Sequence, residues 1–285
     1  PSVLHVRLPM PEGDTMRTGI TELLFHQGDS VYETRIFIPS GASGQERIPT
    51  VLMFHGGGGT GAGQAELDSF EALAEAEGFA VVHPTADPSW PLWQIYDGDH
   101  PERNDVAFAE ELIDTLIADW CADPSRIYSV GFSIGGTFSA RLSCEIPERI
   151  AGVGAVGQIA VAAQLPDPSL PMPLIQINGT ADPVVPFDGN AESTVSEAPD
   201  AWQWMLHTNI AEAFAAGAAR RGCHTEPSVF GVGNEVVGYR YSGCDGDVEM
   251  LRYEVNGGGH VWPGDIPGRS EMGHTTTDIS AAREI

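Results

Sequence analysis

Apolar runs alternate with amphipathic segments along most of the chain. Runs of five to nine residues rich in β-branched and aromatic side chains predict strands at residues 31–39, 50–54, 79–84, 126–132, 150–156, 173–178 and 248–255. Several of these runs are apolar at consecutive positions, which is typical of strands buried on both faces of a sheet. Longer segments with apolar residues three or four positions apart predict helices at 64–78, 104–121, 137–146 and 202–223.

The alternation of strands and helices predicts the fold class. Strands connected by helices favour an α/β fold with a mostly parallel central sheet and helices on both faces. The chain contains no internal repeat, and no loop is long enough to form a large lid domain. We therefore predict a single domain over residues 1–285, in which residues 1–30 form an N-terminal extension or edge strands and residues 186–201 are a candidate flap.

The charge of the chain is strongly negative and narrows the range of partners. Forty acidic residues oppose fourteen basic ones, all of them arginine, for a formal net charge of −26. Such a field repels phosphate backbones, so we expect neither nucleic acid nor an anionic membrane as a partner. No apolar run approaches the roughly 20 residues that a membrane helix needs. Two explanations account for this composition: adaptation to high salt, and replacement of lysine by arginine in a GC-rich genome. The sequence does not indicate an oligomeric state.

The four cysteines predict disulfides rather than metal binding. Cys121, Cys144, Cys223 and Cys244 form no CxxC pair, whereas zinc sites usually take closely spaced ligands. Two disulfides formed in an oxidising compartment are the favoured interpretation, with four buried thiols as the alternative. Cys223 and Cys244 flank a predicted hairpin around residues 231–238, so by elimination Cys121 would pair with Cys144. We expect a secreted or periplasmic protein without a bound metal.

The most specific motif is Gly-Phe-Ser-Ile-Gly at residues 131–135, the only GxSxG in the chain. A predicted strand precedes it and a predicted helix follows it, which is the context of a nucleophile elbow. Ser133 would then occupy a strained turn at a helix N-terminus, where an anion is favoured. An ordinary loop serine is the alternative. We predict Ser133 as the nucleophile.

A serine nucleophile needs an acid that comes after a later strand. Asp182 follows the predicted strand at 173–178 and lies where active-site residues of open α/β sheets collect. Asp188 is the main alternative and Asp167 a weaker one. We predict Asp182 as the acid of the site.

The general base is expected to be the last member in chain order. Among nine histidines, His260 alone follows a strand directly after the acid, within the sequence VNGGGHVWPG at 255–264. His224, beside Cys223, is expected to be structural, and His274 is expected to cap a C-terminal helix. We predict His260 as the base.

The sequence HGGGGTGAG at 55–63 follows a predicted strand directly and supplies a candidate oxyanion hole. The backbone N–H of Gly57 or Gly58, together with that of Ile134, would bind the developing negative charge. The same loop formally matches a dinucleotide-binding GxGxxG, but the next strand does not end in the required acid. The absence of lysine excludes a phosphate-binding P-loop. We therefore expect no cofactor.

Three tryptophans are candidates for lining a substrate pocket: Trp90, Trp93 and Trp262. For Trp90 and Trp93, packing in the core is an equally good explanation, because large aromatic side chains usually serve the core. Trp262 is the best of the three because it lies two residues after His260.

In this order, HGGGG, GFSIGG, NGTADPVVPF and GGGHVWPG resemble the α/β-hydrolase family of poly(3-hydroxybutyrate) depolymerases, feruloyl esterases and acetylxylan esterases. The resemblance extends from about residue 31 to residue 264, and includes Asp105-Val106 at a helix start and the Cys223–Cys244 spacing. It implies a secreted serine carboxylic-ester hydrolase without cofactor, acting on feruloyl, acetyl or hydroxyalkanoate esters. The chain shows no extra substrate-binding module, which favours soluble or oligomeric esters. A non-catalytic binding module on this scaffold and a nucleotide-dependent oxidoreductase are the alternatives.

Overall fold

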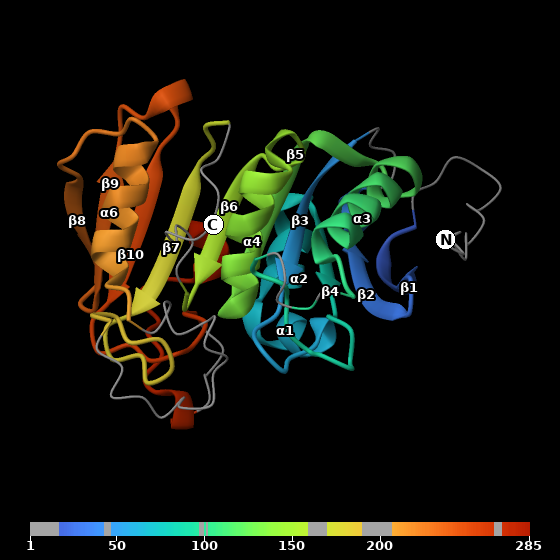
Figure 1. Cartoon of the computed structure of the whole chain (residues 1–285), viewed down its shortest axis with the longest axis horizontal. Helices are drawn as coiled ribbons and strands as arrows, with labels where there is room; N and C mark the ends of the chain where they lie inside the picture. The colour runs from blue at the N-terminus through green and yellow to red at the C-terminus, as the bar shows by residue number, and fades with distance from the viewer. Residues whose placement is uncertain are drawn as a thin grey trace.

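The computed structural model describes residues 17–42, 47–96, 100, 102–158, 170–189, 207–264 and 270–285. Within these ranges the strands form one sheet in the order β1-β2-β4-β3-β5-β6-β7-β10-β9-β8 (Figure 1). The strands are β1 (Gly19–Gln27), β2 (Ser30–Ile38), β3 (Ile48–Phe54), β4 (Ala80–Pro84), β5 (Ala122–Phe132), β6 (Gly152–Val156), β7 (Leu174–Gly179), β8 (Ser228–Val232), β9 (Val236–Tyr241) and β10 (Met250–Val255). The helices are α1 (Gly61–Asp68), α2 (Phe70–Glu77), α3 (Asp105–Asp119), α4 (Ile134–Glu145), α6 (Ile210–Arg220) and α7 (Ala281–Glu284).

The centre of the sheet is parallel and its margins are antiparallel. Neighbouring strands from β4 through β3, β5, β6 and β7 to β10 run parallel, whereas β1, β2, β8 and β9 join by antiparallel pairing. Every residue of β4 and β6 is buried, as the consecutive apolar runs predict. The predicted fold class, a mostly parallel α/β sheet, is confirmed.

Helices cover both faces of the sheet, as predicted. Side chains of α3, α4 and α6 pack with the sheet in one apolar cluster that includes Phe108, Phe138 and Phe214. Phe70 of α2 and Ala281 of α7 pack in a second cluster against the opposite face. Figure 1 shows α3, α4 and α6 in front of the sheet and α2 behind it. Among the residues described, no helix is long and apolar enough to cross a membrane.

The segment predicted as one helix at 64–78 forms two helices. Ser69 adopts a left-handed backbone conformation between α1 and α2. The carboxylate of Asp68 accepts a hydrogen bond from the backbone N–H of Phe70 at 2.9 Å and lies 3.1 Å from His83 Nε2. Because the Asp68 carboxylate accepts the first N–H of the second helix and is held by His83 of β4, the chain turns where the apolar spacing alone predicts continuity.

Two regional predictions extend beyond the described residues. β1 is an edge strand of the sheet, and residues 1–16 lie outside the described part of the chain. Most of the candidate flap, residues 190–201, also lies outside it. The helix predicted at 202–223 is described as α6, which begins after the capping residue Asn209.

One of the two expected disulfides is present. Cys223 and Cys244 are bonded, and they flank the antiparallel pair β8–β9 that forms the predicted hairpin. The prediction that Cys121 pairs with Cys144 is wrong, because neither sulfur takes part in a disulfide. Both side chains pack at the margin of the larger apolar cluster, where a thiol behaves as a small apolar group. Pairing by elimination ignores the short distance that a disulfide requires between two Cβ atoms.

Candidate active site

Ser133 occupies a strained turn between β5 and α4. Its backbone has φ 53° and ψ −127°, a combination that non-glycine residues rarely adopt. A Cβ atom on Gly131 would lie 2.2 Å from the backbone of Gly135, and one on Gly135 would lie 2.3 Å from the carbonyl oxygen of Phe54. Both positions therefore require glycine, and the close packing that they permit holds the turn in place.

Ser133, His260 and Asp182 form one chain of hydrogen bonds. His260 Nε2 lies 3.0 Å from Ser133 Oγ, and His260 Nδ1 lies 2.7 Å from Asp182 Oδ2. The three residues follow β5, β10 and β7, whose carboxyl ends meet at one edge of the sheet because these strands are parallel. The structure thus brings together three residues that are separated by up to 127 positions in the chain.

The carboxylate of Asp182 is held from both sides. Its Oδ1 atom accepts hydrogen bonds from the backbone N–H groups of Val184 at 2.7 Å and Val185 at 2.8 Å, while Oδ2 faces His260. Asp182 is buried, so these donors compensate for the loss of water. Asp188, the main alternative from the sequence, is exposed farther along the same loop. Asp167 lies outside the described residues.

The glycines before His260 allow a close contact with a later segment. The backbone N–H of His260 donates to the Met272 carbonyl at 2.7 Å, and that of Gly259 donates to the His274 carbonyl at 2.9 Å. A Cβ on Gly259 would lie 2.0 Å from the Met272 oxygen, so a larger residue would push the two segments apart. This pairing fixes the backbone from which the imidazole of His260 projects.

The prediction that His274 caps the last helix is wrong. α7 begins after Ser280, and the ring of His274 instead lies 3.0 Å from the carboxylate of Glu235. His224 packs against Gly243, next to the disulfide partner Cys244. Neither histidine takes part in the hydrogen-bond chain of Ser133.

The oxyanion loop, residues 55–59, has one unengaged candidate donor. The N–H of Gly58 donates to the Pro91 carbonyl at 2.9 Å, and the N–H of Gly59 donates to the Gly56 carbonyl at 2.9 Å. Within the described residues, the N–H groups of Gly57 and Ile134 donate to no protein acceptor. The geometry therefore favours Gly57 over Gly58 as a donor to a bound oxyanion.

His55 orients this loop through both ring nitrogens. Its Nδ1 lies 2.7 Å from the Gly56 carbonyl, and its Nε2 accepts the backbone N–H of Ala86 at 3.0 Å. Burial lowers the pKa of His55 to about 4, and the hydrogen bond to Gly56 opposes that shift only in part. The ring is therefore neutral near pH 7, with its proton on Nδ1.

The lowered pKa of His55 makes stability depend on pH. A histidine in the unfolded chain titrates near 6.5, so between pH 6.5 and 4 the unfolded state binds a proton that the folded state does not. This contribution to the free energy of unfolding is complete above about pH 6.5 and falls by about 3 kcal/mol as the pH drops to 4. Urea denaturation of wild type and His55→Gln is expected to show the advantage of the wild type shrinking by that amount. Parallel pH curves for the two proteins would contradict this expectation.

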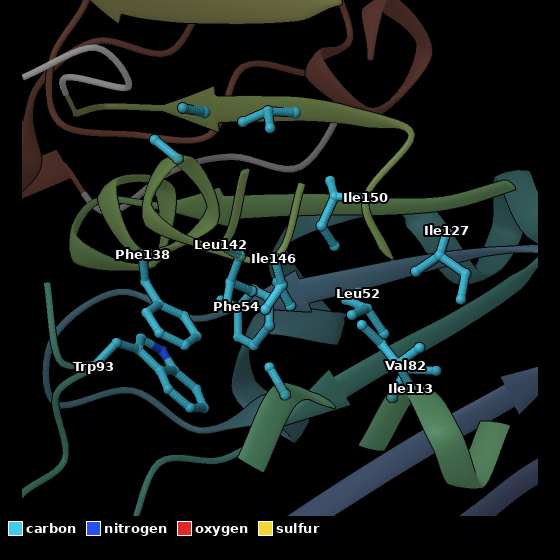
Figure 2. Packing of buried hydrophobic residues seen from close by; sticks show 14 of the residues in the cluster. Leu52, Phe54, Val82, Trp93, Ile113, Ile127, Phe138, Leu142, Ile146 and Ile150 are labelled. Atoms are coloured by element: carbon cyan, nitrogen blue, oxygen red, sulfur yellow. The ribbon is translucent and has the colours of Figure 1, made fainter. Parts of the chain in front are cut away.

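Two of the three candidate tryptophans are buried. Trp93 is fully buried and packs against Phe54 and Phe138 (Figure 2). Its indole N–H donates to the His55 carbonyl. The expectation that Trp93 lines a substrate pocket is therefore wrong, because its ring belongs to the core. Trp262 is 7% exposed and packs against Phe132, which leaves little of its surface for a substrate.

Trp90 is the partly exposed member of the three. Its ring contacts His100 and lies 5.2 Å from the guanidinium of Arg103. It belongs to a loop that contacts the oxyanion loop through the Pro91 carbonyl.

Sequence reasoning missed two neighbours of the site. The ring of Phe132, the residue before the nucleophile, lies 5.0 Å from the imidazole of His260 and limits its rotation. Arg103 donates hydrogen bonds to the carbonyls of Trp90 and Leu92, next to the oxyanion loop. Phe132 is the second residue of the GxSxG motif, so the motif places it beside the nucleophile. No local sequence feature marks Arg103. In the described ranges, no three histidine, cysteine or acidic side chains are grouped as metal ligands.

Comparison with known proteins places the chain in a family. A family model described as esterase PHB depolymerase matches residues 32–225, which is more than half of the chain. The chain belongs to the PHB depolymerase esterase family. NocK of Nocardia uniformis subsp. tsuyamanensis, which carries an esterase name, is 31% identical over 254 residues, covering 83% of this esterase and 72% of NocK.

Two further relatives agree with this assignment. Feruloyl esterase B of Piromyces equi is 29% identical over 230 residues, which cover 78% of this esterase but only 41% of that longer protein. The solved structure of an acetyl xylan esterase from Aspergillus awamori matches with a TM-score of 0.63 at 14% identity, covering 85% and 94% of the two chains. The structural match shows the shared fold. Together with the family match, these relatives identify the chain as a carboxylic-ester hydrolase.

Proposed function

We propose that this esterase is a serine hydrolase in which Ser133, His260 and Asp182 form the catalytic triad. The observation that carries the proposal is the continuous hydrogen-bond chain from the Asp182 carboxylate through the His260 ring to Ser133 Oγ. A serine hydroxyl becomes nucleophilic when an oriented base can take its proton, and this chain supplies both the base and its orienting acid.

The proposed reaction is a two-step acyl transfer. Ser133 Oγ attacks the ester carbonyl carbon as its proton moves to His260 Nε2, and the N–H groups of Ile134 and Gly57 bind the resulting oxyanion. The bond from the carbonyl carbon to the alcohol oxygen then breaks, and His260 gives its proton to that oxygen. Water attacks the acyl-enzyme by the same route and releases the acid and Ser133. Asp182 orients the ring of His260 and stabilises its charged form.

The proposed substrates are feruloyl, acetyl or hydroxyalkanoate esters, in soluble or oligomeric form. The relatives support this range, because a feruloyl esterase and an acetyl xylan esterase are among them. Trp90, partly exposed beside the oxyanion loop, is the proposed aromatic contact for the substrate. The Cys223–Cys244 disulfide supports a secreted or periplasmic location, since disulfides persist in oxidising compartments. The proposal needs no cofactor, nucleic acid or membrane.

A serine-directed fluorophosphonate probe tests the proposal. We expect one label per chain on the peptide that contains Ser133, and ester hydrolysis that falls in proportion to labelling. A non-catalytic binding module would stay unlabelled, and a nucleotide-dependent oxidoreductase would change its intrinsic fluorescence on adding a dinucleotide. Hydrolysis that continues after complete labelling would reject the triad. Methyl ferulate, p-nitrophenyl acetate and butyrate, acetylated xylan and a hydroxybutyrate trimer, assayed side by side, decide among the substrate classes.

A further inference from the structure

A neighbouring loop, residues 86–94, supports the oxyanion loop at three points. The backbone N–H of Ala86 donates to His55 Nε2 at 3.0 Å, and the indole N–H of Trp93 donates to the His55 carbonyl at 3.1 Å. The Pro91 carbonyl accepts the N–H of Gly58 at 2.9 Å. We call residues 86–94 the support loop. These contacts fix His55 and Gly58, which lie before and after Gly57 in the chain.

Leu92 brings the support loop against Gly57 itself. A Cβ atom on Gly57 would lie 2.9 Å from Leu92 Cδ2 and 3.9 Å from the side chain of Ile134. Gly57 therefore lies next to the side chains of Leu92 and Ile134. Any shift of the support loop changes the position of both the Gly58 anchor and the apolar neighbour of Gly57.

The guanidinium group of Arg103 holds the part of the support loop around Pro91, while Arg141 donates to the Gln94 carbonyl at the end of the loop. Arg103 Nη1 donates to the Trp90 carbonyl at 2.6 Å, and Nη2 donates to the Leu92 carbonyl at 3.3 Å. These two carbonyls flank Pro91, whose own carbonyl accepts from Gly58. Because the fork of an arginine is planar and rigid, its two donors hold the carbonyls on either side of Pro91 and so restrict the direction of the Pro91 carbonyl.

Asp105, at the start of α3, holds Arg103 in turn. Arg103 Nη2 lies 2.8 and 2.9 Å from the two carboxylate oxygens of Asp105, and the two side chains are 1% and 0% exposed. The Asp105 carboxylate also accepts the hydroxyl of Tyr32 at 2.7 Å and the backbone N–H of Gln94, the last residue of the support loop, at 2.8 Å. One buried carboxylate thus fixes both the arginine and the end of the loop.

A buried ion pair is weak evidence of stability, because the desolvation of two charges offsets their attraction. Apart from each other, the arginine donates to two carbonyls of the support loop, and the carboxylate accepts from the support loop and from Tyr32. The geometry points to Arg103 as a positioning residue of the oxyanion hole: through its pair with Asp105 it fixes Pro91, which fixes Gly58 and so aims the N–H of Gly57. This inference rests on the proposed function of Gly57.

The variant Arg103→Met, compared with Arg252→Met, tests the inference. Arg252 is a matched control because it is also buried, also paired with an acid, Glu254, and also stacked on an aromatic ring, while it contacts neither loop. Loss of the Pro91 anchor is expected to speed amide exchange of the peptide that carries Gly58 and Gly59 roughly tenfold or more, measured by hydrogen-exchange mass spectrometry. Arg252→Met is expected to destabilise the protein without this local change.

Steady-state kinetics give the functional readout. A misaimed oxyanion donor affects the transition state more than the bound ester, so kcat is expected to fall roughly ten- to hundredfold while KM changes less than about threefold. The affinity for a trifluoromethyl ketone, whose adduct with serine carries an oxyanion, is expected to weaken by a factor similar to the fall in kcat. Arg252→Met is expected to keep the wild-type kcat and inhibitor affinity.

Each result decides one part of the inference. Exchange, kcat and inhibitor affinity that match those of Arg252→Met would overturn the positioning role of Arg103. The exchange readout needs no turnover, so it decides the positioning role even where the wild type hydrolyses no ester and the proposed function fails. Should Arg103→Met not fold, Arg103→Lys keeps the charge beside Asp105 but cannot hold both carbonyls, and it is expected to speed Gly58 exchange by at least about threefold.

Discussion

Replacing Ser133 with alanine is expected to lower kcat for ester hydrolysis by about a millionfold, the loss seen when the nucleophile of a serine triad is removed. The reason is chemical rather than structural. The variant has no oxygen to form the acyl-enzyme, while His260 and the N–H donors keep their positions. Hydrolysis of p-nitrophenyl acetate and labelling by the fluorophosphonate probe measure the effect, and both are expected to be lost together.

The matched control is Ser139→Ala. Ser139 lies on α4, the helix that begins directly after Ser133, and it is buried, whereas Ser133 is partly buried. The hydroxyl of Ser139 has no hydrogen-bond partner in the described part of the chain. It is expected to keep full activity. Both variants are expected to melt within about 2 °C of the wild type, because neither removes a buried apolar contact. Activity retained by Ser133→Ala, with the labelled peptide elsewhere in the chain, would move the nucleophile away from the elbow.

The sequence alone predicts the serine, the acid and the histidine of the candidate site, because the fold fixes the order in which they follow one another along the chain. In a parallel sheet the carboxyl ends of neighbouring strands lie at one edge, so a serine after one strand, an acid after a later one and a histidine after the last can meet there. The motif glycines agree with this picture for a steric reason. Gly131 and Gly135 are required because the turn brings backbone atoms within 2.2–2.3 Å of the position of a Cβ atom.

The predictions that failed depended on distances between segments that no local pattern records. Trp93 donates its indole N–H to the carbonyl of His55 in the oxyanion loop, yet its ring packs against Phe54 and Phe138 in the core. The predicted disulfide between Cys121 and Cys144 rests on elimination alone: it assumes that the two cysteines left over must pair with each other. The break at Ser69 arises because the carboxylate of Asp68, at the end of α1, accepts the N–H of Phe70 and lies against His83 of β4.

The choice between Gly57 and Gly58 shows most clearly what the sequence could not reveal. Gly57 and Gly58 are identical in sequence, and the Pro91 carbonyl distinguishes them, because it accepts the N–H of Gly58. Pro91 is held by Arg103, which comes from outside every motif that the sequence analysis used. The choice of donor in the proposed oxyanion hole thus depends on a tertiary contact that the glycine motif itself does not indicate.

Asp182→Asn is expected to lower kcat by about ten-thousandfold while leaving the fold intact. The side-chain oxygen at Oδ1 accepts two backbone N–H groups, from Val184 and Val185, so the oxygen of the asparagine must keep that position. Its NH₂ group then faces His260 Nδ1, which has to accept a hydrogen bond. The ring proton moves to Nε2, the atom that faces Ser133 Oγ, and His260 can no longer take the proton of the serine.

This argument predicts a difference between two aspartates of one loop. Asp188→Asn, at the exposed alternative position, is expected to keep the wild-type kcat and pH profile, since its carboxylate lies outside the hydrogen-bond chain of His260. Single-turnover hydrolysis of p-nitrophenyl acetate compares the acylation step of the two variants directly. A kcat that is unchanged in Asp182→Asn but lost in Asp188→Asn would transfer the role of the acid to Asp188. It would also mean that the loop rearranges when the ester binds, since the 2.7 Å contact to His260 belongs to Asp182 alone among the described carboxylates.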